Sequence, residues 1–266
     1  MDATYGVLWA LPRACWIAFL VLMLIWIVHT QHGFAFSKTM MGSQGFLSYH
    51  YVFMTVAWPI CMFEAIFSYR APLYKLPHRN AHKYLHVALQ TASGIFIILG
   101  LVFVGLFKRY NGEAQFFSVH SWLGAIAIAA YIAQYTAGFW AYLVSRWSPQ
   151  RKAAFYSVHR FLGSACLLTA FAAILAGLQE VQIFDMWFKY GIKGFDGATA
   201  YSMLAIFTPI MALLILIQAL VIVFHLVHGQ QAIPVSRGAG PAGAVQEARG
   251  NKSSLGENGV ITLNAL

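Results

Sequence analysis

Four histidines recur at nearly the same depth in four successive apolar segments of the sequence. They are His50, His86, His120 and His159, and each lies near the beginning of its segment. A histidine inside a bilayer is energetically costly and usually has a partner, so its repetition indicates a shared role. Imidazole nitrogens are common metal ligands in proteins. The pattern therefore favours metal centres built from histidines on facing helices, as cofactor sites in helical bundles are.

The segments that carry these histidines are long enough to cross a membrane. Each can span about 30 Å of hydrocarbon at about 1.5 Å per residue. Two further apolar segments bring the expected total to six. The expected spans are 14–30, 46–69, 82–107, 118–144, 155–178 and 201–226. The sequence thus predicts an all-α integral membrane protein with six transmembrane helices, in which helices two to five form a four-helix core and the first and sixth flank it.

The composition supports a membrane protein and argues against several other classes. Of the 266 residues, 60% are hydrophobic and 9% are charged, whereas about a quarter are charged in ordinary soluble domains. The net charge is +9, but no long basic run exists, so we expect no nucleic-acid partner. The three cysteines form neither a CxxC pair nor a CxxCH motif for covalent cofactor attachment.

The charges beside the spans predict the orientation of the chain. The loops between spans two and three and between spans four and five carry seven Lys and Arg, against five on the other side. By the positive-inside rule the richer side is cytoplasmic, so both termini are expected in the cytoplasm. We expect residues 1–228 to form the membrane domain. Residues 229–266, rich in Gly, Ala and Ser, are predicted to be a disordered cytoplasmic tail.

This orientation sorts the histidines into two pairs. His50 and His120 fall near the non-cytoplasmic face, and His86 and His159 near the cytoplasmic face. Zinc and di-iron sites need further carboxylates or thiolates, and none accompanies these pairs. Two imidazoles per centre instead suit a haem iron, whose other four ligands come from the porphyrin. With both axial positions filled, electron transfer is favoured over oxygen chemistry.

Small residues near the histidines predict room for a flat macrocycle. Gly124 and Gly163 follow His120 and His159 by four residues, an interval that returns to the same helix face. The glycines at positions 138 and 177 follow the same histidines by eighteen residues, and Gly94 follows His86 by eight. We expect Gly124 and Gly163 to contribute to cofactor binding.

Two other interpretations remain open from the residues alone. A histidine in a membrane helix can simply hydrogen-bond between helices, and glycines there commonly serve packing. The chain would then be a haem-free multispan scaffold or transporter. Alternatively, a b-type membrane subunit could exchange electrons with a quinone or a partner protein.

Four short stretches resemble the cytochrome b561 family. They are SYH at 48–50, KYLH at 83–86, SVHSWLG at 118–124 and SVHRFLG at 157–163. The resemblance covers about 14–228, and it implies a transmembrane di-haem ferric or monodehydroascorbate reductase driven by cytosolic ascorbate. It implies two haem b groups, with His50 paired to His120 and His86 to His159. One departure is that many members have His-Pro at the first ligand, whereas Tyr51 follows His50 here.

Four cations converge on the predicted cytoplasmic face. Ascorbate is an anion at neutral pH, and helix N-termini also favour anions. The resemblance implies that Lys83 and a basic residue of the loop between spans four and five, Arg151, contact ascorbate. These two are the predicted catalytic contacts, with Arg79 and Lys152 beside them. The alternative is that positive-inside loops contain such residues in any case.

At the opposite face the sequence offers a weaker acceptor site. Lys108, Arg109 and Tyr110 could attract a ferric chelate or monodehydroascorbate, although exposed loop charge explains them as well. The other expected partners are the lipid bilayer and, as an option, a second copy in a homodimer. The expected location is the plasma membrane or an endomembrane such as that of a vacuole or vesicle.

Two further polar features fall outside this scheme. Glu64 lies fourteen residues after His50, so we expect it buried on a similar helix face, where it could relay protons, hold a propionate or form a structural hydrogen bond. His78, His82 and His86 have a spacing that can build a zinc face. The prolines at 72 and 77 argue against a continuous helix there.

Overall fold

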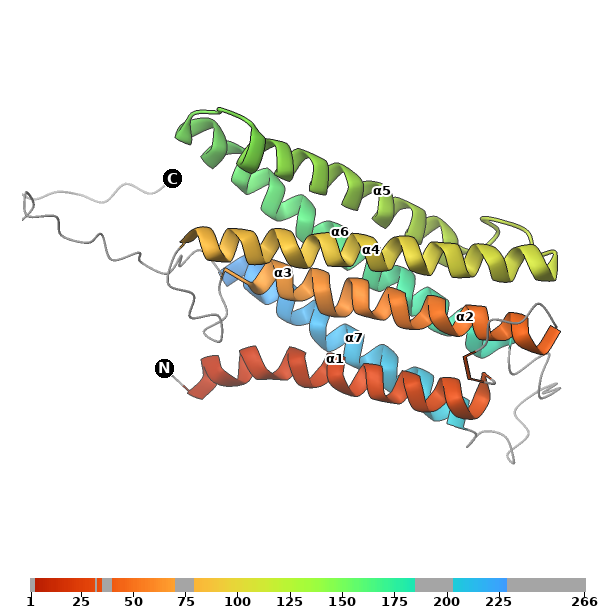
Figure 1. Ribbon diagram of the computed structural model, residues 1–266. Coiled ribbons are helices and arrows are strands. Elements are labelled where there is room, and N and C mark those ends of the chain that lie inside the picture. The colour runs from red at the N-terminus through yellow and green to blue at the C-terminus, as the bar shows by residue number, and fades with distance from the viewer. Residues whose placement is uncertain (1–2, 32, 35–39, 70–78, 185–202, 229–266) are drawn as a thin grey trace, which may run out of the picture. The chain divides into compact units, whose positions relative to one another are not determined.

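A computed structural model of the chain describes residues 3–31, 33–34, 40–69, 79–184 and 203–228 (Figure 1). All of them fall in the first of two compact units, Met1–Gln230. The predicted tail at 229–266 lies outside the described residues.

The described secondary structure is entirely helical. Six helices are long and apolar enough to cross a membrane, which confirms the predicted fold class. The elements are α1 (Ala3–Thr30), α2 (Met40–Thr55), the π-helix η1 (Val56–Met62), α3 (Phe63–Phe67), α4 (Arg79–Asn111), α5 (Val119–Phe139), the π-helix η2 (Trp140–Val144), α6 (Pro149–Phe184) and α7 (Met203–His228).

Several spans differ from their predicted form. The fifth is longer, because α6 runs from Pro149 to Phe184 instead of 155–178, and the fourth ends in the π-helix η2. The first helix begins at Ala3 and continues through Pro12, although residue 14 was the expected start. The second span is not one regular helix, because the π-helical turn η1 separates α2 from α3. Pro59 lies inside this turn. A proline cannot donate the regular backbone hydrogen bond, and π-turns accommodate such an interruption within a helix.

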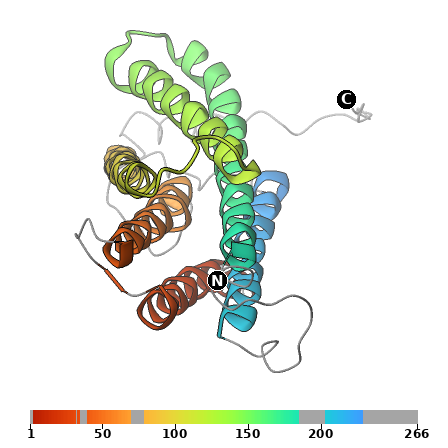
Figure 2. The same ribbon diagram turned by 90° about the vertical axis from the view of Figure 1, so that its right-hand side faces the viewer.

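The helices associate as three main pairs within this unit. α2 packs along α4 with η1, α5 packs along α6, and α1 packs along α7. The α6–α7 contact joins the pairs, whereas α4 and α5 touch only slightly despite being consecutive. Figure 2 shows α5 and α6 side by side. The predicted four-helix core thus consists of two helix pairs that face each other.

Local sequence explains where the central helices begin and end. Ser118 caps α5: its side chain accepts a hydrogen bond from the Ser121 backbone, and the Ser121 hydroxyl accepts one from the Ser118 backbone. Gly112, with a φ of 66°, ends α4 in the left-handed conformation. Pro149 is the first residue of α6, where its missing N–H costs nothing.

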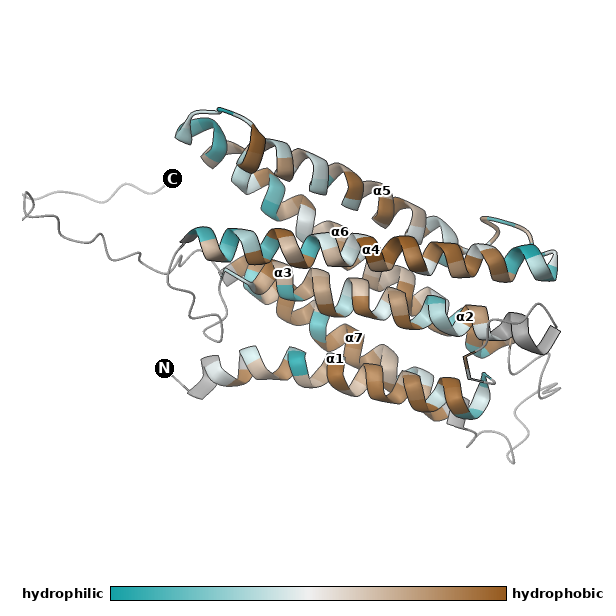
Figure 3. Ribbon diagram, in the orientation of Figure 1, coloured by the Kyte–Doolittle hydropathy of each residue, from teal (hydrophilic) through white to brown (hydrophobic). Residues whose placement is uncertain are grey.

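The deepest packing lies around α1, α3 and α7. Large side chains such as Phe19, Trp26, Phe63 and Met211 are almost completely buried there. Figure 3 shows apolar residues dominating the middle of α4 and hydrophilic residues at both its ends. This distribution suits a helix with its middle in hydrocarbon and its ends in the interfacial regions.

Candidate functional site

The structure brings His50 on α2 next to His120 on α5. The centroids of the two imidazole rings are 6.2 Å apart, and the ring planes are at 90°. The two residues are 70 positions apart in the sequence, so only the packing of the bundle brings them together. We call them the 50/120 pair.

A second pair lies further along the same four spans. His86 on α4 faces His159 on α6, with ring centroids 6.4 Å apart and planes at 70°. We call these residues the 86/159 pair. The two pairs belong to opposite ends of the bundle, because α2 and α5 begin where α4 and α6 end.

Three of the four rings have a fixed orientation and tautomer. The Nδ1 atom of His50 lies 2.9 Å from the carbonyl oxygen of Gly100. The corresponding distance is 2.7 Å from His86 to Ala65 and 2.8 Å from His120 to Ala173. A carbonyl oxygen only accepts hydrogen bonds, so each Nδ1 carries the proton and donates it. The Nε2 lone pair of each ring is therefore left available to bind a metal.

His159 is held differently. Its Nδ1 atom is buried and has no hydrogen-bond partner among the described residues. Its ring instead packs against the rings of Tyr142 and Phe155, at centroid distances of 5.9 and 5.7 Å. The aromatic contacts fix the position of this imidazole without fixing its tautomer.

The spacing within each pair suits one metal ion between two imidazoles. A metal–nitrogen bond of about 2.0 Å on each side, with rings of ordinary bond lengths, places the centroids about 6.3 Å apart. The observed 6.2 and 6.4 Å agree with that value. In the described part of the chain no group of three or more His, Cys, Asp or Glu could hold a metal. A metal at either pair would therefore need most of its ligands from a macrocycle, and haem iron meets that condition.

Glycines make room for the histidines of the opposite pair. A Cβ atom on Gly177 would lie 2.8 Å from the Nδ1 of His120, and one on Gly138 would lie 2.8 Å from the Cε1 of His159. The two contacts are reciprocal, since Gly138 is on the span of His120 and Gly177 on the span of His159. Each ring thus requires a glycine on the facing helix.

The other glycines divide into two kinds. At Gly124 and Gly163 a Cβ atom would meet no other group within 4 Å, so these positions have the open space that a bound macrocycle needs. At Gly94 a Cβ atom would lie 2.9 Å from the hydroxyl oxygen of Tyr131. The interpretation that Gly94 makes room for the macrocycle is therefore wrong, because Tyr131 fills this place and donates a hydrogen bond to the Gln90 carbonyl.

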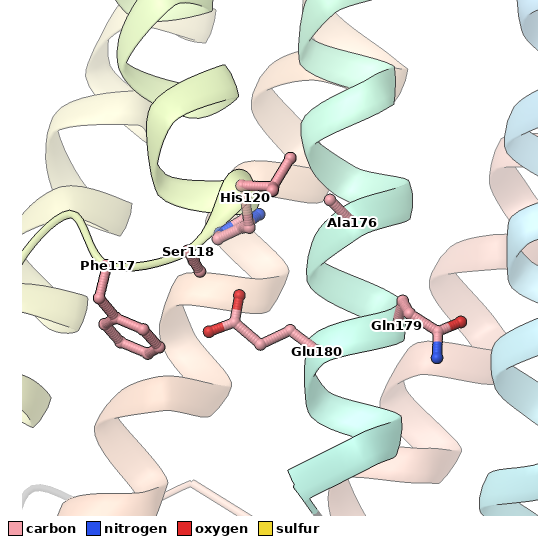
Figure 4. A pocket seen from close by; sticks show the side chains of 7 residues that line it. Phe117, Ser118, His120, Ala176, Gln179 and Glu180 are labelled. Atoms are coloured by element: carbon pink, nitrogen blue, oxygen red, sulfur yellow. The ribbon is translucent and has the colours of Figure 1, made fainter.

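A cavity of about 460 Å³ opens beside the 50/120 pair. Its lining residues are Phe117, Ser118, Val119, His120, Ala176, Gln179 and Glu180. Figure 4 shows the Glu180 carboxylate extending from α6 toward the beginning of α5. Its Oε2 atom is buried and has no hydrogen-bond partner among the described residues. Glu180 was not predicted as a site residue, because its only signal was an acidic residue directly after an apolar span.

At the 86/159 end, Tyr142 joins two of the predicted cations. Lys83 donates a hydrogen bond from Nζ to the Tyr142 carbonyl at 2.6 Å, and the Tyr142 hydroxyl donates to the Lys152 carbonyl at 3.3 Å. Arg151 is exposed in the first turn of α6. Arg79 begins α4, but its side chain lies outside the described residues. Tyr142 was not predicted, because nothing in its local sequence distinguishes it from other interfacial tyrosines.

The residues predicted for the acceptor lie in the last turn of α4. Lys108 donates to the Ala114 carbonyl at 3.1 Å, and its Nζ lies 5.1 Å from the centre of the Phe117 ring. Arg109 is exposed, and the Tyr110 ring stacks on Phe46 at 5.7 Å. Of these three residues, Lys108 and Tyr110 contact neighbouring groups, whereas Arg109 has an exposed side chain.

Glu113 adds negative charge near this turn. Burial raises the pKa of its carboxyl above the usual value; Lys108 opposes the shift and Glu180 reinforces it. The region around the 50/120 cavity therefore contains two carboxyl groups as well as the predicted cations.

Glu64 is buried and forms structural hydrogen bonds, which confirms part of its prediction, but it does not share the face of His50, so the predicted face is wrong. Its Oε2 atom accepts a hydrogen bond from Arg13 on α1 at 2.5 Å, whereas His50 is directed toward α4 and α5. The expected common face assumed 3.6 residues per turn, but the π-turn η1 lies between the two residues. Ala65, one residue later, holds the position opposite His86.

The sequence was compared with known proteins. It is 24% identical to the plasma membrane ascorbate-dependent reductase CYBRD1 of Mus musculus over 243 residues, which cover 91% of this chain and 80% of that protein. It is 28% identical to the probable ascorbate-specific transmembrane electron transporter 1 of Oryza sativa subsp. japonica over 200 residues, 74% of this chain and 81% of that protein. Both similarities extend over most of the described helices.

A third relative, the lysosomal membrane ascorbate-dependent ferrireductase CYB561A3 of Danio rerio, is 27% identical over 168 residues, 63% of this chain and 66% of that protein. The family model for eukaryotic cytochrome b561 matches residues 49–185. This match covers just over half of the 266 residues and includes all four paired histidines. The chain therefore belongs to the eukaryotic cytochrome b561 family.

Proposed function

We propose that this protein carries electrons across a membrane from cytosolic ascorbate to a ferric chelate or monodehydroascorbate on the other side. The observation that carries the proposal is the pair of imidazoles at each end of the bundle, at 6.2 and 6.4 Å, with three of the four tautomers fixed. The family's relatives include ascorbate-dependent reductases, which supports ascorbate as the donor.

In this proposal His50 with His120, and His86 with His159, hold two haem b groups. A haem held by two histidines would supply one-electron transfer. Gly124 and Gly163 leave space beside the two sites. Carbonyl acceptors at Gly100, Ala65 and Ala173 orient their rings and make them better donors to a metal.

The cations at the 86/159 end are proposed to bind ascorbate. The Lys83–Tyr142–Lys152 contacts place two lysine-bearing segments together at the beginnings of α4 and α6. Arg151 is exposed beside them. Helix N-termini and cations both favour an anion, so this end is suited to an anionic donor.

The 50/120 end is proposed to reach the acceptor. Arg109 is the freely exposed cation there, with Lys108 and Tyr110 in the same turn. The protein would reside in the plasma membrane or an endomembrane with both termini in the cytoplasm. Relatives named for the plasma and lysosomal membranes support either location.

An absorbance spectrum of the detergent-purified protein tests the proposal. We expect a b-type spectrum with about two haems per chain, reduced rapidly when ascorbate is added. If ascorbate does not reduce the haem, the electron donor must instead be a quinol or a protein. A colourless protein would reject the haem assignment and favour a scaffold or transporter.

Lys83→Met tests the donor site, because it keeps the aliphatic length and removes the charge. The loss of a charge-assisted hydrogen bond is worth about 1.5–3 kcal/mol, so the KM for ascorbate should rise at least tenfold. The absorbance spectrum should not change. Arg146→Ala is the control, since Arg146 is a cation near this end that is exposed, whereas Lys83 is partly buried. An equal KM in Lys83→Met and the control would remove Lys83 from the donor site.

A further inference from the structure

The carbonyl that orients His86 belongs to a turn contacted by two histidines of α4. His86 donates to the Ala65 carbonyl at 2.7 Å, and His82 donates to the Ser68 carbonyl at 2.8 Å. Tyr69 packs its ring against both imidazoles, at 5.6 and 6.2 Å. We call residues 64–68 the α3 turn. Its position determines where His86 finds its hydrogen-bond acceptor.

The opposite side of the α3 turn is attached to α1 by a buried ion pair. Arg13 donates from Nη2 to Glu64 Oε2 at 2.5 Å, with only 16% and 8% of the two side chains exposed. Trp16 donates from Nε1 to the other Glu64 oxygen at 3.4 Å, and Arg13 also donates to the Trp9 carbonyl at 2.7 Å. Charges within a membrane span persist only when paired, so this contact strongly fixes the two helices.

Helix α1 is in turn held by α7 at the same level. Gln218 is fully buried, and its Nε2 donates to the Pro12 carbonyl at 3.2 Å. Pro12 directly precedes Arg13. A continuous series of polar contacts therefore runs from α7 through α1 to Glu64, and Glu64 is adjacent in sequence to Ala65.

We propose that Arg13 and Glu64 are positioning residues for His86, which extends the role of α1 beyond flanking the core. The inference rests on the proposed function, because it concerns the haem held by the 86/159 pair. The ion pair keeps the Ala65 carbonyl within hydrogen-bond distance of His86 Nδ1. A stronger Nδ1–H···O bond makes the imidazole a better donor to iron and stabilises the oxidised state.

The direction of the effect follows from this coupling. If the ion pair is removed, the α3 turn is less firmly held and the hydrogen bond to His86 weakens. The midpoint potential of the 86/159 haem should then rise, and its low-spin electron paramagnetic resonance signal should shift. The 50/120 haem should keep its potential and signal, because its acceptors are on α4 and α6.

The decisive variant is the double substitution Arg13→Met/Glu64→Gln in the full-length, haem-loaded protein. It removes one positive and one negative charge, so a change in net charge cannot account for the shift. It also leaves no unpaired buried charge, which favours folding. Thr55→Val is the matched control. Thr55 also joins the second span to α1, through Met23 at 3.1 Å, but it does not contact the α3 turn.

The readouts are a redox titration and the electron paramagnetic resonance spectrum of the oxidised protein. A higher potential and a shifted signal for one haem only, absent in Thr55→Val, would support the inference. Wild-type values for both haems in the double variant, or equal shifts in both, would overturn it. The wild-type protein is measured first: a protein without haem overturns the proposed function as well, whereas two normal haems with an unchanged double variant overturn this inference alone.

Discussion

At the scale of single residues, backbone atoms set the orientation of three of the four paired histidines. Backbone carbonyls of Gly100, Ala65 and Ala173 accept the Nδ1 protons of three histidines. Because these acceptors are backbone atoms, substituting the residues does not remove them. The size of the neighbouring side chains matters instead. The glycines opposite His120 and His159 are the clearest case, because a larger residue would occupy the space of the imidazole ring.

A methyl group at either of these glycines should disturb one site and spare the other. Gly177→Ala places a Cβ 2.8 Å from His120, and Gly138→Ala places one 2.8 Å from His159, so each ring must move. We expect haem content to fall from two toward one per chain, with a stability loss of about 1–3 kcal/mol from overpacking. Pigment analysis and thermal unfolding measure both effects.

Gly105→Ala is the control for these variants. A Cβ at Gly105 meets no group within 4 Å, so the variant should keep both haems. It should gain about 0.5–1 kcal/mol from helix propensity. Wild-type haem content in both Gly138→Ala and Gly177→Ala would contradict the reciprocal arrangement.

Glu113 makes a specific contribution to the pH dependence of stability. Burial raises the pKa of its carboxyl in the folded protein above the reference value of 4.5, and Glu180 adds to the shift. Between the reference value and the folded value, the folded state binds more protons than the unfolded state. Stability therefore falls as pH rises through this window.

Glu113→Gln should remove this contribution to the dependence of stability on pH. The test compares melting temperatures of the two proteins across the acidic range in the same detergent. The wild type should lose more stability than the variant as pH rises from the reference value, and above about pH 7 their slopes should agree. Because Glu113 is largely exposed, the difference between the two proteins should be small. Melting temperatures that change in parallel over the whole pH range would contradict the predicted contribution of Glu113.

At the scale of the elements, irregular turns decide which side chains meet. The π-turn η1 changes the register of the second span, so that Ala65 faces His86 and Glu64 faces Arg13. The second π-turn, η2, contains the Tyr142 carbonyl that binds Lys83. π-turns commonly occur at functional sites, and here both lie within spans that carry the paired histidines.

The cap of α5 should control the stability of the turn that carries His120. Ser118→Ala removes the hydrogen bond that the Ser118 hydroxyl accepts from the Ser121 backbone, which should cost about 1 kcal/mol. His120 lies two residues beyond the cap, so the 50/120 haem should be lost more readily on heating. Ser157→Ala, an exposed position within α6, is the control. Equal melting temperatures for the two variants would show that the cap contributes nothing.

At the scale of the whole molecule, the orientation decides which haem meets ascorbate. The excess of cations in two loops predicts that the 86/159 end is cytoplasmic. The three cysteines are buried, so an introduced cysteine would dominate labelling by a membrane-impermeant maleimide.

Gln150→Cys and Ala114→Cys report on the two ends, and both positions are exposed. In sealed right-side-out vesicles we expect Ala114→Cys to be labelled directly. Gln150→Cys should be labelled only after permeabilisation. The opposite result would invert the orientation and place ascorbate at the 50/120 end.

The sequence by itself determined the number and approximate positions of the membrane spans and the register of the four histidines. These features depend on local properties: hydrophobic length sets a span, and distance from the helix start sets the depth of a histidine. The two His–His pairs also followed, since alternating helices place every second histidine at the same end. The fourth span was predicted to begin at 118, where Ser118 caps α5, whereas the fifth was predicted to begin at 155 and α6 begins at Pro149.

Only the tertiary structure decided what holds the histidines. The acceptor of His50 is 50 residues away, that of His120 is 53 residues away, and Arg13 is 51 residues from Glu64. Contacts at such separations depend on how helices rotate against one another. The π-turn η1 changes that rotation beyond what a 3.6-residue period can predict, so Glu64, which follows the turn, was assigned to the wrong face, whereas His50, which precedes it, was paired correctly.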